Sequence, residues 1–387
     1  MTQIHLYNSV SGAAFWPRLA EEFAQEGHEV RSHQALSSEE YRRPRHLLGR
    51  IWLRWRMSGG FACSALAKIW FERRAPGARV VHVVTTNPFF LPPLAAWAAA
   101  LRNEQTVFVL FDLYPDALVA AGWTKADSWL ARVLARVTRA GLRRCDATVF
   151  LGERLRKHVE TRYQPARLGR VIPVGADGSP FRNRPPRRVD GREPVIVLYA
   201  GMMGRMHEIE TLCAALVEPL PSGVILRFQA MGPAYRDLCH RVPAGHAEFG
   251  GPLDDLRWAE ALKNAHVGLV TLAPGAEKVA MPSKAYSSLV SGQAVLAICP
   301  SDSDLADLIR QHDCGWVVTP GDVEALRKVL AEIASNRDAL HGKRTRAHHA
   351  GQTLYDMHPV AGHWRQLLTD LSRAAACERK ERAEGTP

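Results

Sequence analysis

Short apolar runs alternate with amphipathic segments along almost the whole chain, which predicts βα units and parallel sheets. The pattern occurs twice. The first set of predicted strands covers residues 4–7, 29–32, 80–85, 106–111, 147–151 and 171–173, with helices such as 17–25 and 128–142 between them. The second set covers 195–200, 224–231, 267–272, 294–298 and 315–319, with helices at 208–216, 253–263, 284–291, 304–311 and 323–335. We therefore predict an α/β fold with two parallel sheets.

The alternation stops between Gly178 and Glu193, where proline and arginine replace the apolar side chains. Such a segment is typical of an exposed linker. A closing helix follows near residues 360–371, and the last residues resemble a frayed tail. The predicted boundaries are 1–178, a linker at 179–193, a second domain at 194–358, a terminal helix at 359–376 and a frayed tail at 377–387.

The uncharged stretch 80–101 is long enough for a membrane span, but Asn87-Pro88 and Pro92-Pro93 interrupt it. Proline inside a helix removes a hydrogen bond and clashes with the preceding turn. We predict a strand, a turn and a buried helix here.

Composition narrows the class of protein. A length of 387 residues suits two domains, and 47% hydrophobic with 23% charged residues is ordinary for globular chains. Seven scattered cysteines without a C-x-x-C pair favour reduced thiols over disulfides or zinc, and no leader pattern precedes Ile4. We expect a cytoplasmic protein without a metal or cofactor. The net charge of +11 indicates a polyanionic partner.

Two loops in the second half could bind phosphate, because ligands of open α/β sheets bind beyond the carboxyl ends of the strands. In the first loop, Gly201 and Gly204 permit close backbone approach and Arg205 adds a guanidinium. In the second, Pro282 and Ser283 precede Lys284 at a predicted helix start. Turn glycines, a capping serine and solvated basic side chains are the simpler interpretation of each loop alone. Together the two loops favour a diphosphate site.

The order and spacing of these motifs resemble glycosyltransferase family 4, in the branch that serves bacterial exopolysaccharide, O-antigen and capsule synthesis. In the second half the matching segments are LYAG with Gly204-Arg205, PSKAY, SGQAV and CGWVV. In the first half they are GHEV, DLYPD after a strand and VIPVGAD before the linker. The resemblance therefore covers nearly the whole chain.

The resemblance implies two Rossmann-like domains facing across a cleft (GT-B), with the terminal helix crossing back to the first domain. It also implies a metal-independent, retaining transfer from a nucleotide-diphosphate sugar held mainly by the second domain. Arg205 and Lys284 would stabilise the leaving diphosphate, and Gly201, Gly204, Pro282, Ser283 and Ser287 would line the donor site. Asp112 would lie near the sugar or acceptor, and Gly12 in an acceptor-side loop; a turn-capping role for Asp112 is equally compatible with the sequence.

One departure from the family bears on activity. Family members usually carry two glutamates with seven residues between them around the second loop, and here those positions are Val279 and Ser287. The second glutamate normally holds the ribose, and serine offers only a shorter, uncharged hydrogen bond. An inactive, membrane-associated subunit of a polysaccharide assembly is therefore the rival hypothesis. A nucleotide-sugar epimerase on the same scaffold is a third.

A basic and aromatic segment spans residues 42–74. Within it Leu47, Leu48, Ile51, Trp52 and Trp55 recur at helical spacing, whereas Arg50 and Arg54 lie largely elsewhere. Packing of the tryptophans on the sheet is one interpretation. The combination favours an in-plane helix at an anionic membrane, with Arg50, Trp52, Arg54 and Trp55 facing the lipid. No nucleic-acid-binding motif accompanies it. We expect a polyprenyl-linked acceptor and a protein peripheral to the inner face of the plasma membrane.

Overall fold

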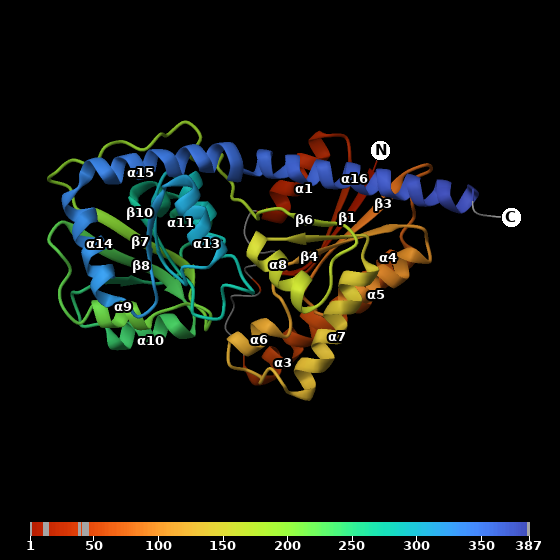
Figure 1. The fold of residues 1–387 in the computed structure, drawn as a ribbon, viewed down its shortest axis with the longest axis horizontal. Helices are drawn as coiled ribbons and strands as arrows, with labels where there is room; N and C mark the ends of the chain where they lie inside the picture. Colours follow the sequence, from red (N-terminus) through yellow and green to blue (C-terminus); the bar gives the residue numbers. More distant parts are fainter. Residues whose placement is uncertain (1, 11–14, 38–39, 41–45, 385–387) are drawn as a thin grey trace. The chain divides into compact units, whose positions relative to one another are not determined.

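The computed structural model describes residues 2–10, 15–37, 40 and 46–384, and the chain forms two compact α/β units (Figure 1). The first unit comprises Met1–Val119, Thr124–Pro173 and Met357–Pro387. The second comprises Ala120–Trp123 and Val174–Asp356. Each unit has its own sheet and its own buried core.

The first unit is built on a six-stranded parallel sheet in the order β2-β1-β3-β4-β5-β6. Its strands are β1 (Thr2–Val10), β2 (Glu29–Leu36), β3 (Arg79–Thr85), β4 (Gln105–Leu110), β5 (Ala147–Phe150) and β6 (Gly169–Val171). The central strands β3, β4 and β5 are almost entirely buried. Near-continuous apolar runs are expected where helices cover both faces of a parallel sheet.

Different helices cover the two faces of this sheet. One layer packs α1 (Phe15–Gln25) and α16 (Met357–Glu384) against inward-facing residues such as Ile4 and Val83. The opposite layer packs α4 (Phe61–Phe71) and α5 (Leu91–Ala100) against Tyr7 and Val84. The remaining helices are α3 (Leu47–Trp55), the π-helical turn η1 (Arg56–Gly60), α6 (Asp116–Ala120), α7 (Trp129–Arg144) and α8 (Glu153–Arg162).

The terminal helix α16 is part of the first core. Its residues Val360, Trp364 and Leu367 are buried in the layer that contains α1. Its backbone carbonyls are also bound from the sheet, because Arg79 donates to the oxygen of Leu368 at 2.8 Å and Gln105 to that of Leu371 at 3.1 Å. These contacts tie the helix to the amino-terminal ends of the central strands β3 and β4.

The second unit has a six-stranded parallel sheet in the order β12-β11-β10-β7-β8-β9. Its strands are β7 (Val195–Met202), β8 (Val224–Met231), β9 (Glu248–Gly250), β10 (Val267–Thr271), β11 (Ala294–Ile298) and β12 (Gly315–Val318). The helices are α9 (Glu210–Ala215), α10 (Pro233–Arg241), α11 (Asp255–Asn264), α12 (Lys284–Val290), α13 (Asp304–His312), α14 (Val323–Ser335), α15 (Arg337–Ala350) and the π-helical turn η2 (Gly351–Tyr355).

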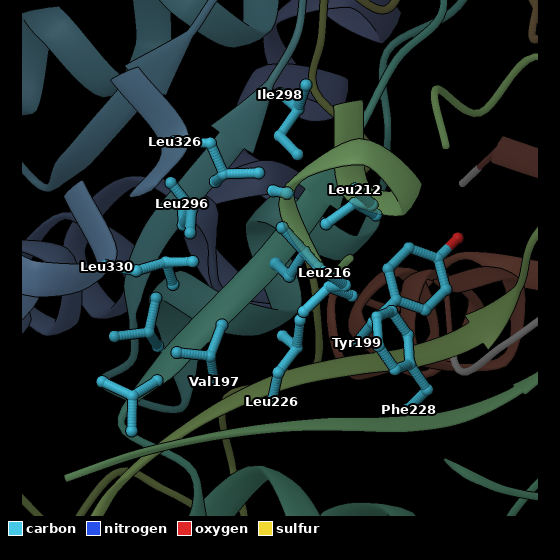
Figure 2. Packing of buried hydrophobic residues seen from close by; sticks show 14 of the residues in the cluster. Val197, Tyr199, Leu212, Leu216, Leu226, Phe228, Leu296, Ile298, Leu326 and Leu330 are labelled. Carbon is cyan, nitrogen blue, oxygen red and sulfur yellow. The ribbon is translucent and has the colours of Figure 1, made fainter. Parts of the chain in front are cut away.

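Figure 2 shows the main core of the second unit, where side chains of β7, β8 and β11 meet those of α9 and α14. Val197 and Tyr199 from β7 and Leu226 and Phe228 from β8 are all at most 2% exposed. Close packing on both sides fixes the register of β7. It therefore also fixes where the loop after Met202 begins.

Several details differ from the sequence-based expectations. The helix expected at 208–216 is the six-residue α9, which begins only at Glu210. The short β9 and the helix α10 after Gly232-Pro233 were not predicted, since three residues of strand carry little periodicity. The last helix continues to Glu384, into the segment expected to be frayed, because no glycine or proline lies between Gly362 and Gly385.

The interpretation of residues 80–101 as strand, turn and helix is confirmed by β3 and α5, and α5 buries Pro92 and Pro93 in its first turn. No helix among the described residues is long and apolar enough to span a membrane. All seven cysteines are free thiols.

Candidate functional site

The strand order of the second unit has a reversal beside β7. From β7 the sheet continues through β8 and β9 in one direction and through β10, β11 and β12 in the other. The loops after β7 and β10 therefore lead to opposite faces of the sheet. Open α/β sheets bind ligands in the crevice at such a point. Arg205 lies in the loop after β7, and Lys284 follows the loop after β10. The two loops are joined, because Ala273 N–H donates to Met206 O at 2.9 Å.

Lys284 reaches back from α12 onto the end of β7. Its Nζ donates to the carbonyl oxygen of Met202 at 2.9 Å and lies 5.1 Å from the centroid of the Tyr199 ring. Gly201 makes this possible. A Cβ at Gly201 would stand 3.4 Å from Lys284 Cε, and the backbone there has φ +114°, which side-chain-bearing residues rarely adopt.

Burial changes the charge balance around Lys284. Desolvation lowers the pKa of its ammonium from 10.5 to about 8. Nearby His207 has its pKa lowered to about 3, first by burial and then by the positive charge of Lys284, so its ring is neutral at pH 7. The His207 Nε2 lies 3.5 Å from Lys284 Nζ, and its Nδ1 lies 3.2 Å from Gly204 O. The same Nδ1 also lies 3.1 Å from Gly204 N, so the His207 ring contacts both the ammonium and the glycine turn.

Arg205 occupies a more open position than Lys284. Its side chain is exposed and, among the described residues, has no ion-pair partner. Gly204 beside it is open as well, since a Cβ there would meet nothing within 4 Å. An exposed guanidinium next to an unobstructed backbone can take up an anion without breaking an existing contact.

The helix starts contribute less than the sequence predicts. Ser283 is at the N-cap of α12 but makes no side-chain capping bond. At α9, Glu208 already accepts hydrogen bonds from Thr211 N at 2.8 Å and from its hydroxyl at 3.0 Å. The two helices have only seven and six residues. Because a short helix has a weak dipole and α9 already has a carboxylate at its start, the basic side chains are the main positive groups of the site.

The positions that lack the family glutamates differ in accessibility. Val279 is 1% exposed and belongs to the interior, whereas Ser287 is half-buried on α12. Pro282 accepts a bond from Ala285 N at 3.2 Å and thereby forms the first turn of α12. A carboxylate is present at Glu277, but its Oε2 is bound by the N–H of Gly275 at 2.6 Å. Glu277 therefore supports the loop itself.

Sequence reasoning did not single out His207, Glu208, Glu277 or Gly232. A Cβ at Gly232, which has φ +122°, would lie 2.4 Å from the carbonyl oxygen of Met203. The loop after β8 therefore passes directly against the loop after β7. A glycine-proline pair after a predicted strand was the available signal for Gly232, whereas nothing in the local sequence marks His207.

In the first unit, Asp112 is half-buried just after β4, at the carboxyl edge of that sheet. Asn87 Nδ2 donates to its Oδ2 at 3.2 Å, and Tyr114 donates to Asn87 Oδ1 at 3.2 Å. Burial raises the pKa of the Asp112 carboxyl, against the bond from Asn87. Gly12 lies outside the described residues.

Within the basic and aromatic segment, α3 presents most of its apolar side chains outward. On α3 only Leu53 is buried, while Trp52 and Trp55 are 51% and 60% exposed. Arg50 and Arg54 are exposed on the same helix. The interpretation that these tryptophans pack on the sheet is therefore wrong, because α4 and α5 supply that layer of the core. Arg42, Arg43 and Arg45 lie outside the described residues.

The fold, with two units each built on a six-stranded parallel sheet, is of the GT-B class, as the sequence predicted. Residues 15–179 match the model of Glycosyltransferase Family 4, which confirms the resemblance over this part of the chain. The chain is also 26% identical over 275 residues to the probable glycosyltransferase WbjE of Pseudomonas aeruginosa. That match spans 64% of this chain and 64% of WbjE, so it covers less than two thirds of the relative.

Two solved structures show the same fold over nearly the whole chain. Sucrose-phosphate synthase from Thermosynechococcus elongatus superposes with a TM-score of 0.67 at 18% identity, covering 97% of this chain and 100% of that one. HepE of Anabaena, solved with UDP-glucose, gives a TM-score of 0.66 at 12% identity, covering 96% and 100%. At these identities the likeness concerns the fold.

Proposed function

We propose that this protein is a retaining, metal-independent glycosyltransferase of the hexosyltransferase type. In this proposal it moves a sugar from a nucleotide-diphosphate sugar to a polyprenyl-diphosphate-linked saccharide in bacterial surface polysaccharide synthesis. The observation that carries the proposal is the position of Arg205 and Lys284 on the two loops that flank the reversal point of the second sheet. This is where a parallel α/β sheet binds a nucleotide.

The proposed chemistry is stabilisation of the departing diphosphate. As the bond between the sugar and the diphosphate breaks, negative charge grows on the phosphate oxygens. Lys284 supplies an ammonium that is already partly desolvated, and Arg205 supplies an exposed guanidinium with a planar pair of donors. Preorganised positive groups are most effective in a site from which water is excluded. Gly201 and Gly204 leave room for the diphosphate beside them.

The donor is the least defined component of this proposal. HepE, which shares the fold, was solved with UDP-glucose, so UDP-sugars are the first candidates for this chain. Ser287 takes the place of a carboxylate that would hold the ribose, which lowers the expected donor affinity. GDP- and dTDP-sugars are therefore tested beside UDP-sugars.

The proposed acceptor side is a membrane surface. Exposed Trp52 and Trp55 on α3, with Arg50 and Arg54 on the same helix, match an in-plane interfacial helix. A polyprenyl-linked acceptor would be presented at the same surface, on the inner face of the plasma membrane. Asp112, at the carboxyl edge of the first sheet, is the proposed polar group on the acceptor side.

The rival function is an inactive subunit of a polysaccharide assembly, and the absence of carboxylates at Val279 and Ser287 is the observation that favours it. Two assays separate the hypotheses. A thermal-shift screen against UDP-, GDP- and dTDP-sugars detects donor binding, because a ligand of the native state raises the melting temperature. Incubation of the matched donor with lipid-linked acceptor then detects transfer.

Donor binding followed by a glycosylated lipid product supports the enzyme. Binding of donors without transfer to any lipid-linked acceptor, and without hydrolysis, supports the inactive subunit. Conversion of the donor to an epimer would show that the protein is an epimerase. The absence of any stabilisation by all three donor classes contradicts the proposed donor site itself.

A further inference from the structure

Three histidines gather on one face of the first sheet. Parallel pairing places His5 on β1 opposite His82 on β3, and His33 on β2 opposite Tyr7. Because side chains alternate along strands, His5, His33 and His82 share the face that α4 covers. Glu72 follows the last residue of α4 and adds a carboxylate to this group.

Three ligand atoms of this group converge on one point. His5 Nδ1 lies 3.1 Å from His33 Nε2 and 3.2 Å from Glu72 Oε2, and the third side of the triangle is 3.6 Å. In a tetrahedral zinc site with metal–ligand bonds of about 2.0–2.1 Å, neighbouring ligand atoms stand about 3.3–3.4 Å apart. The observed triangle therefore has the size of one face of such a tetrahedron.

Hydrogen bonds satisfy this triangle only in part, because His5 Nδ1 and His33 Nε2 can share one hydrogen bond while Glu72 Oε2 is left without a donor. Glu72 is ion-paired with Arg31 at 2.8 Å, so its oxygens act as acceptors. With hydrogens on both facing nitrogens, the two rings meet as two donors. With a hydrogen on only one of these nitrogens, the other nitrogen and the carboxylate oxygen face each other as two acceptors. In agreement, Glu72 Oε2 is buried without a hydrogen-bond donor among the described residues. A cation at the centre would satisfy all three lone pairs at once.

The surroundings suit a resident ion. The side chains of His5 and His33 are only 3% and 9% exposed, and that of Glu72 is 25% exposed. Arg31 Nη1 holds the other oxygen of Glu72 at 2.8 Å, which fixes the direction of the free one. A cavity of about 10 Å³, lined in part by His5, Lys68 and Glu72, has room for about one water beside this group.

His82 is not available as a ligand. Its Nε2 lies 2.8 Å from Glu104 Oε2 and its Nδ1 lies 3.4 Å from the hydroxyl of Tyr7. Lys68 Nζ lies 2.8 Å from His33 Nδ1. A neutral His33 that binds a metal through Nε2 must carry its hydrogen on Nδ1, so the ammonium and the metal compete for this ring.

We infer that His5 Nδ1, His33 Nε2 and Glu72 Oε2 form a binding site for a divalent first-row metal ion, with Zn²⁺ the best match to two imidazoles and one carboxylate in this geometry. The site is structural. It joins strands β1 and β2 to the end of α4, whose other end continues from η1 and α3. It involves none of the donor-loop residues, and therefore stands apart from the metal-independent transfer proposed above.

The test uses the full chain without an affinity tag, stripped with a chelator and titrated with ZnCl₂ by calorimetry, with metal content measured after dialysis. The wild type is expected to bind one Zn²⁺ per chain and to melt at a higher temperature with zinc. His33→Gln and Glu72→Gln should each weaken binding by more than the roughly 10- to 100-fold that loss of an outer-shell partner costs. Circular dichroism confirms that each variant is folded.

Lys68→Met provides the matched control. It removes the competing ammonium but no ligand, so zinc should bind at least as tightly as to wild type. His349→Gln, an exposed histidine of the second unit, should leave the titration unchanged. The inference is overturned if wild type takes up no zinc at micromolar concentration. It is equally overturned if His33→Gln and Glu72→Gln, folded, bind zinc as wild type does. Should His33→Gln fail to fold, Glu72→Gln decides alone, because Glu72 is partly exposed.

Discussion

Lys284 and Met202 meet across the reversal point of the second sheet, with the lysine Nζ donating to the methionine carbonyl oxygen at 2.9 Å. The contact joins the start of α12 to the last residue of β7. It holds a positive charge next to the glycine turn where we place the donor diphosphate. The predictions below on pH, stability and donor affinity depend on this placement.

The pH dependence of donor use should report Lys284. Its pKa is lowered to about 8 in the free protein, so the ammonium is present below that pH and lost above it. We expect kcat/KM to fall about tenfold per pH unit above about pH 8, because that parameter reports ionisations of the free enzyme. A bound diphosphate stabilises the ammonium, so the fall of kcat with rising pH should occur at a higher pH than the fall of kcat/KM. A flat kcat/KM profile from pH 7 to 9.5 would argue against Lys284.

Lys284 should also reduce the stability of the unliganded protein. In the unfolded chain its pKa is the ordinary 10.5, so between about pH 8 and 10.5 the unfolded state binds more protons and stability rises with pH. Below pH 8 the full desolvation cost is present. Lys284→Met keeps the length of the side chain and removes the charge, and Met202 O still accepts from Tyr199 at 2.8 Å. We expect this variant to be more stable at pH 7 by about 1–3 kcal/mol. Urea unfolding of both proteins measures the difference, and a less stable variant would refute the expectation.

Ser287→Glu should strengthen donor binding. Ser287 is half-buried on α12, where the longer carboxylate can reach a ribose hydroxyl that serine cannot. A charge-assisted hydrogen bond contributes about 1.5–3 kcal/mol, which corresponds to about 10- to 150-fold in donor Kd. Calorimetric titration with the matched donor gives the comparison. Ser283→Glu, four residues earlier and exposed, is the control and should weaken binding through repulsion of the diphosphate. Equal weakening in both variants would place the ribose elsewhere.

Trp52 and Trp55 should bind the protein to anionic bilayers. Replacing both with serine removes the largest exposed apolar groups of α3, and we expect at least a tenfold loss of cosedimentation with anionic liposomes. Reversing Arg50 and Arg54 to glutamate should weaken binding mainly at low salt, at about 1 kcal/mol per basic residue. Leu256→Ser, at a residue 86% exposed in the second unit, is the control and should bind as wild type. A wild-type protein that does not bind these liposomes at low salt would contradict the membrane proposal.

Most of the architecture was predictable because its signal is local. The runs that became β7 and β10 are almost entirely apolar, as is expected of strands covered on both faces. Glycine and proline after them marked the loops. The order of the strands in the sheet could not be predicted from the hydrophobic pattern, although this order places Arg205 and Lys284 beside one reversal point.

The remainder of the site could not be predicted because it depends on contacts between distant segments. The role of Glu208 at the start of α9 and the position of His207 beside Lys284 follow from how loops pack, not from spacing. The group formed by His5, His33 and Glu72 comes from three separate elements and has no spacing motif. For Trp52, periodicity indicated an apolar helix face but not whether another element covers it.

The most direct test of the central claim is turnover of Lys284→Ala and Arg205→Ala with the matched donor and a lipid-linked acceptor. Both variants should fold and bind donor, yet lose on the order of a hundredfold or more in kcat, since each contact strengthens as the diphosphate departs. Lys278→Ala and Arg257→Ala, at exposed side chains of the same unit, should retain wild-type turnover. Near-normal kcat in both Lys284→Ala and Arg205→Ala would contradict the account, because the diphosphate would then be held by other residues.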